Sequence, residues 1–366
     1  MRSNRPNRRT FLKGATAAGI ISLAGCTGNG NGNGNGNGNG NGNGNGNGNG
    51  NGNGNGNGNG LDEVSMEIGS TFEPGHITVE LAEMIADEME AQSDGQFQIT
   101  VTPGGAYGGE DEIAELVRGG TLEALTGGFL PYMMYAEEHY PLLTPFLLED
   151  FDHHLAVFNS DVIQNNAIPQ LIEEGNQRPL GNEVYRGVRH FTSNDPIYHP
   201  DDVAGLDLRL PEIDAWVQVW TAIGANPTPV ALDEMYSAVQ TGVVDSTEGD
   251  VEQIASFNLQ EVQDYLTLTG HRVETGMFMV NEDFWQGLDD TYQEMLEDVA
   301  WEKTEEANEI AIGREDDLVA ELGEEMEIIE EPDLDRDAFF DAAEPALEDL
   351  FDERFEQDLQ DIRDLA

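Results

Sequence analysis

The spacing of apolar residues changes repeatedly between a period of two and a helical period across residues 61–366. Period-two alternation predicts strands, and apolar residues spaced three and four apart predict amphipathic helices. Glycines that follow the helical segments mark their ends. The first elements expected, in chain order, are strand 66–70, helix 76–92, strand 97–101, helix 110–118 and strand 121–126. This β-α-β-α-β order predicts an α/β fold with a parallel sheet and helices on its faces.

The second half of the chain mixes short strands with long helical segments. Its expected elements are a mostly helical stretch 146–174, strands 183–191 and 206–210, helix 212–223, helix 234–241 with Asp233 as N-cap, strands 243–245 and 273–280, a helix over 291–322, and one or two closing helices over 339–365 interrupted near Pro345. A helix as long as 291–322 could lie across two domains, and strand 273–280 could cross back to the first domain.

The first 25 residues have the pattern of an export signal. They contain five basic and no acidic residues, and a 12-residue apolar stretch closes them. This stretch is shorter than the ~20 residues that a spanning helix needs. Arg8 and Arg9, followed by Thr-Phe-Leu-Lys, resemble the twin-arginine signal for export of folded proteins. Leu-Ala-Gly before Cys26 resembles a lipobox, which implies cleavage and lipidation of Cys26; the alternative is that Cys26 is only a small apolar residue of the signal.

Cys26 is the only cysteine, so an intramolecular disulfide, a cysteine metal cluster and a cysteine nucleophile are all excluded. Behind it, residues 29–60 are a strict Asn-Gly alternation. Such a segment has nothing apolar to bury and is expected to be a flexible spacer reaching roughly 30 Å. It would act as a tether, although a neutral low-complexity expansion would behave in the same way.

The charge balance is strongly acidic. The chain has 16 basic and 72 acidic residues, and without the five basic residues of the signal the net charge is 11 − 72 = −61. Such a surface repels phosphates and anionic headgroups, which excludes nucleic acid and anionic membranes as partners. Because ~1 M salt shortens the Debye length to ~3 Å, the composition favours a halophile's protein over an acidic protein of ordinary medium.

Arginine is scarce enough to be informative, with ten in residues 61–366. Arg209 lies in the alternating segment Leu206–Leu210, just before Pro211. The alternation places it on the opposite face of the predicted strand from the leucines. Ligands of open α/β sheets bind beyond the carboxyl ends of strands, and arginine suits bidentate carboxylate recognition. Arg209 is therefore a candidate ligand contact; the alternative is a salt bridge to a nearby acid such as Asp207 or Glu212.

Several segments resemble the solute-binding proteins of tripartite ATP-independent periplasmic (TRAP) transporters, the DctP-like family. They are HPDDVAGLDLRLP at 199–211, GANPTP at 224–229, EMYSAVQTGVVD at 234–245, YLTLTGH at 265–271 and the glycine-rich GGAYGGE at 104–110.

The resemblance implies a two-domain periplasmic-binding-protein-like fold, with a ligand cleft between the domains and a long interdomain helix. Domain I would comprise 61–186 with about 273–315, and domain II 187–272 with about 316–366. It also implies capture of a small organic acid, with Arg209 matching the arginine that clamps the ligand carboxylate.

Arg189 matches a second arginine that often lines the pocket of this family. Gly249 stands where many members have an asparagine that touches the ligand, and Leu232 where many have an aromatic residue, so these contacts are expected to differ. Further expected lining residues, whose alternative is packing or capping, are Tyr236, Glu248, Phe129, Tyr107 and Glu110.

The function expected first is a lipid-anchored, extracytoplasmic solute-binding protein, held at the outer face of the cell membrane by Cys26, that passes its ligand to TRAP permease subunits. A sensor module for a membrane receptor is the second hypothesis. A secreted hydrolase is the third, but no nucleophile, base and orienting acid assemble. The protein is expected to be a monomer without a cofactor. No metal is expected either, since His153 and His154 are adjacent on a predicted helix and point apart. His271 is expected to make a structural hydrogen bond.

Overall fold

The computed structural model of the protein describes residues 61–231 and 234–365. The predicted export signal, the lipidation site Cys26 and the Asn-Gly spacer lie outside the described residues, as do Leu232 and the expected N-cap Asp233. The predictions made for these positions therefore stay predictions. Within the described residues, no helix is long and apolar enough to cross a membrane.

The first five elements form the predicted β-α-β-α-β unit. Strand β1 (Val64–Gly69) pairs in parallel with β2 (Phe97–Thr102) and with β3 (Ala124–Gly127). Helix α1 (Ile77–Gln92) connects the first two strands and α2 (Glu110–Arg118) leads to the third. Both helices begin and end within a residue of the prediction, because their apolar spacing and their flanking caps agree.

Two 17-residue strands continue this sheet and make it mixed. Strand β4 (Gln177–Ser193) pairs antiparallel with β8 (Tyr265–Asn281), and β8 pairs antiparallel with β3. The short strands β7 (Thr247–Asp250) and β9 (Glu327–Ile329) join β4 and β8. The order is β2-β1-β3-β8-β4-β7, with β9 beside β8. Only parts of the two long strands were predicted, because three register shifts along their pairing interrupt the period-two alternation.

A two-stranded sheet carries Arg209. Strand β5 (Asp207–Leu210) pairs in parallel with β6 (Asn226–Pro229), and α6 (Asp214–Ile223) lies between them in sequence. The strand expected over 243–245 is wrong. The backbone N–H of Val243 bonds the carbonyl of Ala238 at the end of a helix, and only at Asp245 does the backbone reach β5, where its N–H donates to the Asp207 carbonyl at 2.8 Å.

The remaining helices are mostly short. They are α3 (Leu130–Tyr135), α4 (Phe151–Phe158), α5 (Ile168–Gly175) preceded by a π-helical turn (Ile163–Ala167), α7 (Met235–Gln240), α8 (Val251–Ser256) and α9 (Glu282–Gly287).

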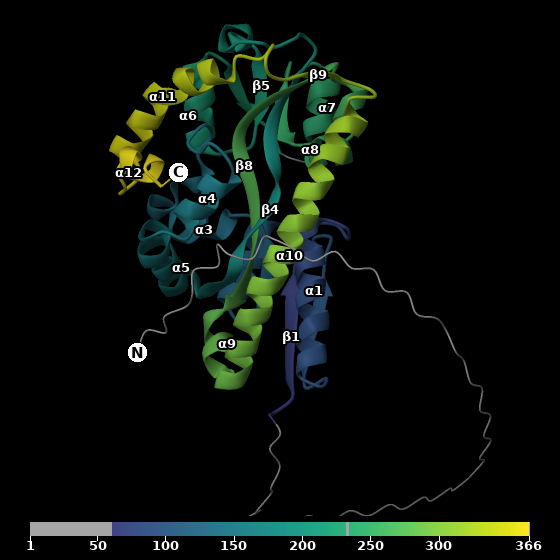
Figure 1. Ribbon diagram of the computed structural model, residues 1–366, viewed down its shortest axis with the longest axis vertical. Helices are drawn as coiled ribbons and strands as arrows, with labels where there is room; N and C mark the ends of the chain where they lie inside the picture. The colour runs from purple at the N-terminus through teal and green to yellow at the C-terminus, as the bar shows by residue number, and fades with distance from the viewer. Residues whose placement is uncertain (1–60, 232–233, 366) are drawn as a thin grey trace, which may run out of the picture. The chain divides into compact units, whose positions relative to one another are not determined.

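The predicted long helix is α10 (Asp290–Leu322), with 33 residues. It packs along β4, contacts α1 and α8, and crosses the face of the molecule drawn in Figure 1. Its own residues Leu296 and Val299 are buried, whereas its Ile312 is half exposed. Helix α10 thus contacts α1 on one side of the long strand β4 and α8 on the other.

The closing helices differ from the prediction at their break. Helix α11 (Arg336–Glu353) continues through Pro345, so the interruption expected there is wrong. The chain breaks only after Glu353, and α12 (Leu359–Arg363) follows. Ala343 and Ala346, on either side of the proline, are buried in the core that α11 shares with α6. This packing compensates for the backbone hydrogen bond that proline cannot donate.

Two large apolar cores flank the long strands. One gathers around Phe146, Trp216 and Trp220, and the other around Met66 and Leu296. Strands β4 and β8 contribute residues to both cores. Their polar residues between the cores are therefore buried, and these residues form the candidate site.

Candidate functional site

A network of buried arginines and carboxylates lies where β4, β7 and β8 run side by side. In the strand register Arg189 on β4 lies opposite Arg272 on β8 and Asp250 on β7. Arg189, Arg209 and Arg272 are only 5%, 2% and 3% exposed. Buried guanidinium groups are rare unless they are paired, so the partners of each one indicate its role.

Arg189 is fully engaged by carboxylates of the protein itself. Its Nε and Nη2 donate to the Glu248 carboxylate at 2.6 and 2.8 Å, and its Nη1 donates to Glu274 at 2.9 Å. The Trp216 ring lies 4.8 Å from its guanidinium carbon. Burial alone would lower the pKa of Arg189, but these carboxylates raise it above its ordinary value. The Nε and Nη2 of Arg189, which could together bind a ligand carboxylate, are therefore already occupied by Glu248 in this structure.

Glu248 is held in place from a second side by His271. The His271 Nε2 lies 3.1 Å from Glu248 Oε2, and its Nδ1 lies 2.8 Å from the Thr269 hydroxyl. Burial alone would raise the pKa of Glu248, but Arg189 and His271 hold it below its usual range. The structural hydrogen bond expected for His271 is thereby confirmed, and the pair fixes the position of Arg189.

Arg209 is buried without such compensation. Its Nε donates to the Val230 carbonyl at 2.9 Å, and none of the carboxylates in the described residues forms an ion pair with it, including Asp207 and Glu212. Burial, together with the nearby charge of Arg189, lowers the pKa of Arg209 to about 10, against the opposing effect of Glu248. A desolvated cation of this kind is stabilised when an anion binds beside it.

Arg272 is a candidate that sequence reasoning did not place in the site. Its Nη1 donates to Glu274 at 2.5 Å, while its Nε and Nη2 are buried and have no hydrogen-bond partner among the described residues. The Phe129 and Trp216 rings lie 4.4 and 5.2 Å from its guanidinium carbon. The available signal was its position directly after His271, at the end of a segment that resembles the family.

Glu110, the first residue of α2, and Arg186 on β4 join the same network. Arg186 Nη1 lies 3.4 Å from Glu274, and its guanidinium lies 4.4 Å from the Phe72 ring. Glu110 accepts a 2.5 Å hydrogen bond from the Gly128 N–H. A Cβ built on Gly128 would lie 3.1 Å from Glu110 and 3.4 Å from Arg186, so both side chains converge on this glycine. Burial raises the pKa of Glu110.

Two of the expected lining residues make their polar contacts elsewhere. The Tyr107 hydroxyl donates to Glu67, and the Tyr236 hydroxyl donates to Glu261 at 2.9 Å. The structure therefore brings together Arg209, Arg189, Glu248, Phe129 and Glu110, and it does not join either tyrosine to them.

Gly249 lies on β7 between Glu248 and Asp250. A Cβ at this position would lie 2.7 Å from the side-chain amide nitrogen of Gln253, which also approaches the Glu248 carbonyl at 3.5 Å. The Gln253 amide thus occupies the space next to Gly249. Any side chain at position 249 would have to displace it.

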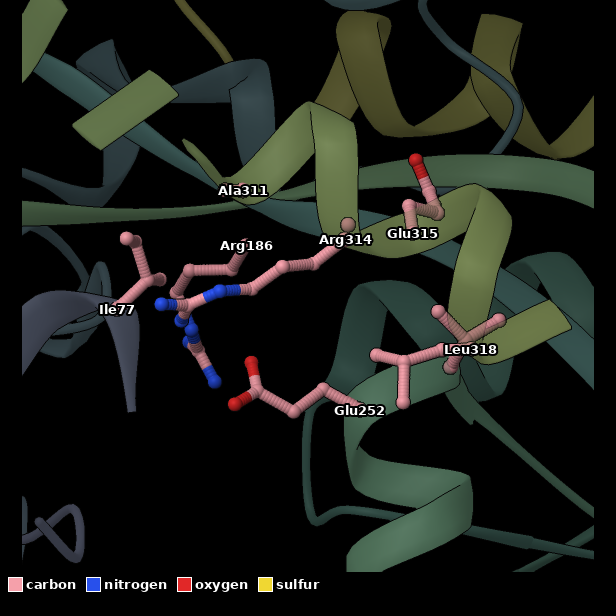
Figure 2. A pocket seen from close by; sticks show the side chains of 9 residues that line it. Ile77, Arg186, Glu252, Ala311, Arg314, Glu315 and Leu318 are labelled. Atoms are coloured by element: carbon pink, nitrogen blue, oxygen red, sulfur yellow. The ribbon is translucent and has the colours of Figure 1, made fainter. Parts of the chain in front are cut away.

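A small cavity borders the network where four elements meet. It has a volume of about 30 Å³, room for one or two waters. In Figure 2 the Arg186 and Arg314 side chains reach toward each other, and the Glu252 carboxylate points toward them. Ile77 also lines this cavity. This space is too small for an organic acid, and neither Arg189 nor Arg209 is among the residues that line it.

The histidine pair on α4 makes two separate contacts. His153 Nε2 lies 3.1 Å from the Ile362 carbonyl, whereas His154 contacts Glu183. Among residues 61–231 and 234–365, no group of three or more possible ligands is arranged to hold a metal ion.

Residues 68–354 match the family model for bacterial extracellular solute-binding protein, family 7, named DctP. The match covers most of the chain. This protein belongs to the DctP family. The family consists of solute-binding proteins rather than enzymes, and its members act outside the cytoplasm.

Relatives of known structure share the whole DctP-family fold. The chain is 27% identical to the sialic acid-binding periplasmic protein SiaP of Vibrio cholerae over 281 residues, 77% of this chain and 86% of that protein. A TRAP periplasmic solute-binding protein of Roseobacter denitrificans with bound L-galactonate is 25% identical, with a TM-score of 0.71, and the match covers 83% of this chain and 99% of that one. One from Polaromonas sp. JS666 bound to D-erythronate is also 25% identical, with a TM-score of 0.73, over 82% and 98%. The predicted two-domain periplasmic-binding-protein fold is thereby confirmed.

Proposed function

We propose that this chain captures a small organic acid by binding its carboxylate to Arg209 and delivers it to TRAP-type permease subunits. The observation that carries the proposal is that Arg209 is buried and forms no ion pair with a carboxylate of residues 61–231 or 234–365, whereas Arg189 beside it is saturated by carboxylates. A planar guanidinium recognises a carboxylate through two parallel hydrogen bonds. The ligand would supply an anion that the described residues of the chain do not.

The class of ligand follows from chemistry shared with the relatives. The Roseobacter and Polaromonas proteins hold L-galactonate and D-erythronate, and SiaP is named for sialic acid. These ligands are all hydroxylated carboxylic acids. Because the polar groups around Arg209 in this chain are buried, we expect the bound acid to be shielded from water on all sides.

Binding would close the two domains around the acid. Helix α10 and the strands β4 and β8 connect elements on both sides of the network, so a bend in them can open and close the site. Arg189, held by Glu248 and Glu274, would keep the floor of the site rigid during this motion. Export through the twin-arginine signal and attachment through a lipid on Cys26 would place the receptor near its permease.

Titration calorimetry in about 2 M NaCl, where surface repulsion is screened, tests the proposal. After a panel of hydroxy, keto and sugar acids has identified a ligand, Arg209→Ala should lower its affinity at least 100-fold, because a desolvated charge pair is lost. Arg178→Ala is the matched control. It also removes a bidentate arginine, paired with Glu282 at 2.7 and 2.8 Å, but outside the network. Retained affinity in Arg209→Ala would refute the role of Arg209.

A further inference from the structure

The small cavity of Figure 2 separates two apolar cores. Of the residues that line it, Ile77 of α1 belongs to the core that contains Leu296, whereas Val251 of α8 belongs to a smaller core that contains Leu266. Both α1 and α8 pack on α10 and on β4. Protein interiors leave few such gaps, and this one gives α8 about 30 Å³ of room to move toward α1.

Opposite charges face each other across this cavity without pairing. In Figure 2 the Glu252 carboxylate of α8 points toward the guanidinium groups of Arg186 and Arg314. Within residues 61–231 and 234–365, Glu252 makes no ion pair and no side-chain hydrogen bond, although the charges of both arginines act on it. The Nε of Arg186 is buried and has no hydrogen-bond partner among these residues. A short approach of α8 would let this donor and the carboxylate form a charge-assisted hydrogen bond.

Arg186 lies at a point where β4 is able to bend. In the pairing with β8, Tyr185 lies opposite Thr275 and the next paired residue, Gly187, lies opposite Glu274. Arg186 is thus the extra residue of a bulge, and bulges bend a strand locally. Gly187 has a φ of 121°, a conformation that side-chain-bearing residues rarely adopt. The glycine therefore permits the bulge that carries Arg186 to the cavity.

Helix α10 is fastened to this bulge on both sides of Arg186. The Asn308 side chain accepts from the Tyr185 N–H at 2.6 Å, and Glu315 accepts from the Val188 N–H at 2.8 Å. Arg314 of the same helix is held by Glu80 of α1 at 2.8 and 3.1 Å. The two arginines therefore lie on elements that are tied together, and Glu252 faces them from α8 across the gap.

The charge of Glu252 changes near neutral pH. The charged groups that face it are Asp250 before α8, Arg186 on β4, Arg314 and Glu315 on α10, and Glu80 on α1. Burial, and after it Asp250, raises the pKa of Glu252 to about 7 against the two arginines. A direct ion pair would lower this pKa, so pairing is favoured as pH rises and is lost as pH falls and the carboxylate takes up a proton.

We propose that Glu252 is a pH-sensitive latch, which pairs with Arg186 when an acid binds and α8 closes the cavity. The inference rests on the proposed function, because the bound acid drives this movement. In the ligand-free protein Glu252 stays unpaired, as the structure shows it. In the acid-bound protein the ion pair slows reopening, and protonation of Glu252 releases it.

Titration calorimetry and stopped-flow dissociation between about pH 5 and pH 8, in about 2 M NaCl, test the latch. The probe is the tightest-binding sugar or hydroxy acid of the panel that stays ionised throughout this range. Wild-type affinity should rise roughly 10-fold with pH, mainly through slower dissociation. His76 and His190 stay neutral meanwhile, because burial lowers their pKa values to about 2 and about 3. Glu252→Gln should bind with the wild type's pH 5 affinity at every pH.

Two further variants separate the latch from a general effect of charge. Glu344→Gln is the matched control, since it removes one carboxylate of α11 that does not line the cavity and is paired with Arg363. It should keep the wild-type pH profile. Arg186→Gln should flatten the profile as Glu252→Gln does, and the losses of the two variants should not add in the double variant, because each removes the same ion pair.

Three results would overturn the latch while acids still bind in an Arg209-dependent manner. They are a wild-type affinity that does not change with pH, a pH profile that survives in Glu252→Gln, and an equal loss of affinity at pH 5 and pH 8 in that variant. The last would mean that Glu252 only supports the local packing. If no acid binds through Arg209, the proposed function fails and the latch fails with it. Unfolding curves establish that each variant is folded.

Discussion

Arg189 and Arg209 are both buried arginines on strands, yet their partners give them different roles. Arg189 has two carboxylates within 2.9 Å, whereas the described partner of the Arg209 side chain is a backbone carbonyl. A buried ion pair adds little net stability, but breaking one leaves an unpaired charge in the interior. Arg189 and Glu248 are therefore a structural pair, and Arg209 is the side chain with charge available for a ligand.

Glu248→Gln should destabilise the protein by about 3–5 kcal/mol, because Arg189 and His271 would then face an uncharged amide in a dry interior. Denaturant unfolding in about 2 M NaCl measures the change. Glu282→Gln is the control, since its partner Arg178 is 29% exposed and the pair should contribute about 1 kcal/mol or less. Equal effects of the two substitutions would contradict the structural role of Glu248.

Glu252 should make stability depend on pH. Burial and the nearby Asp250 raise its pKa from 4.5 to about 7, against the opposing charges of Arg186 and Arg314 and with a further increase from Glu80. At pH values between 4.5 and about 7, the folded state binds more protons than the unfolded state, so stability falls as pH rises. Above about pH 7 this loss of stability is complete.

Glu252→Gln should therefore be more stable than the wild type at pH 8, by about 1 kcal/mol after allowance for solvent screening. This advantage should disappear below about pH 4.5, where both states of the wild type are protonated. Chemical unfolding at a series of pH values provides the measurement. An advantage that does not change with pH would show that packing, rather than the charge of Glu252, is responsible.

Among the secondary-structure elements, α10 contacts elements that lie far from it in the sequence. It packs on β4, touches α1 and α8, and its Arg314 donates to Glu80 of α1 at 2.8 and 3.1 Å. Both of these side chains are partly exposed, so the ion pair contributes little to stability. The apolar face of α10 is then the main source of its attachment.

Leu296→Ala in α10 should cost about 2–5 kcal/mol, because Leu296 is fully buried and its removal leaves a cavity. Ile312→Ala in the same helix is the control, since this side chain is 50% exposed and should cost about 0.5 kcal/mol or less. Thermal or denaturant unfolding distinguishes the two. Similar losses would mean that α10 is held by helix propensity rather than by packing.

For the molecule as a whole, the net charge of −56 opposes compact folding. The described basic residues are mostly paired within the protein, such as Lys303 with Glu88, Glu302 and Glu306. The remaining acidic residues repel one another across the surface. Salt that screens this repulsion should therefore stabilise the fold.

The melting temperature should rise by about 10 °C or more between ~0.1 M and ~2 M NaCl, as the Debye length falls from ~10 Å to less than ~3 Å. Potassium chloride should act similarly, because screening depends on ionic strength. Sucrose at equal osmolality is the control, since it leaves the electrostatic repulsion unchanged. A melting temperature that is independent of salt would contradict the interpretation of the composition as a halophilic adaptation.

Local patterns in the sequence determined the elements whose causes are local. Helices α1, α2 and α10 follow from the apolar period and the capping residues, and β5 follows from alternation that also sets Arg209 apart from its leucines. Membership of the DctP family could likewise be inferred from short segments. These features depend on neighbours within a few residues, which the sequence displays directly.

The tertiary structure alone decided which charges meet. Glu248 is 59 residues from Arg189 and Glu274 is 85 residues from it, so no local spacing predicts that they saturate Arg189. The chain's arginines are alike in the sequence, but the pairing of β4 with β7 and β8 buries Arg272 with its Nε and Nη2 unpaired among the described residues. Because a guanidinium's availability depends on partners brought by distant strands, the folded chain is what separates structural arginines from those that can bind a ligand.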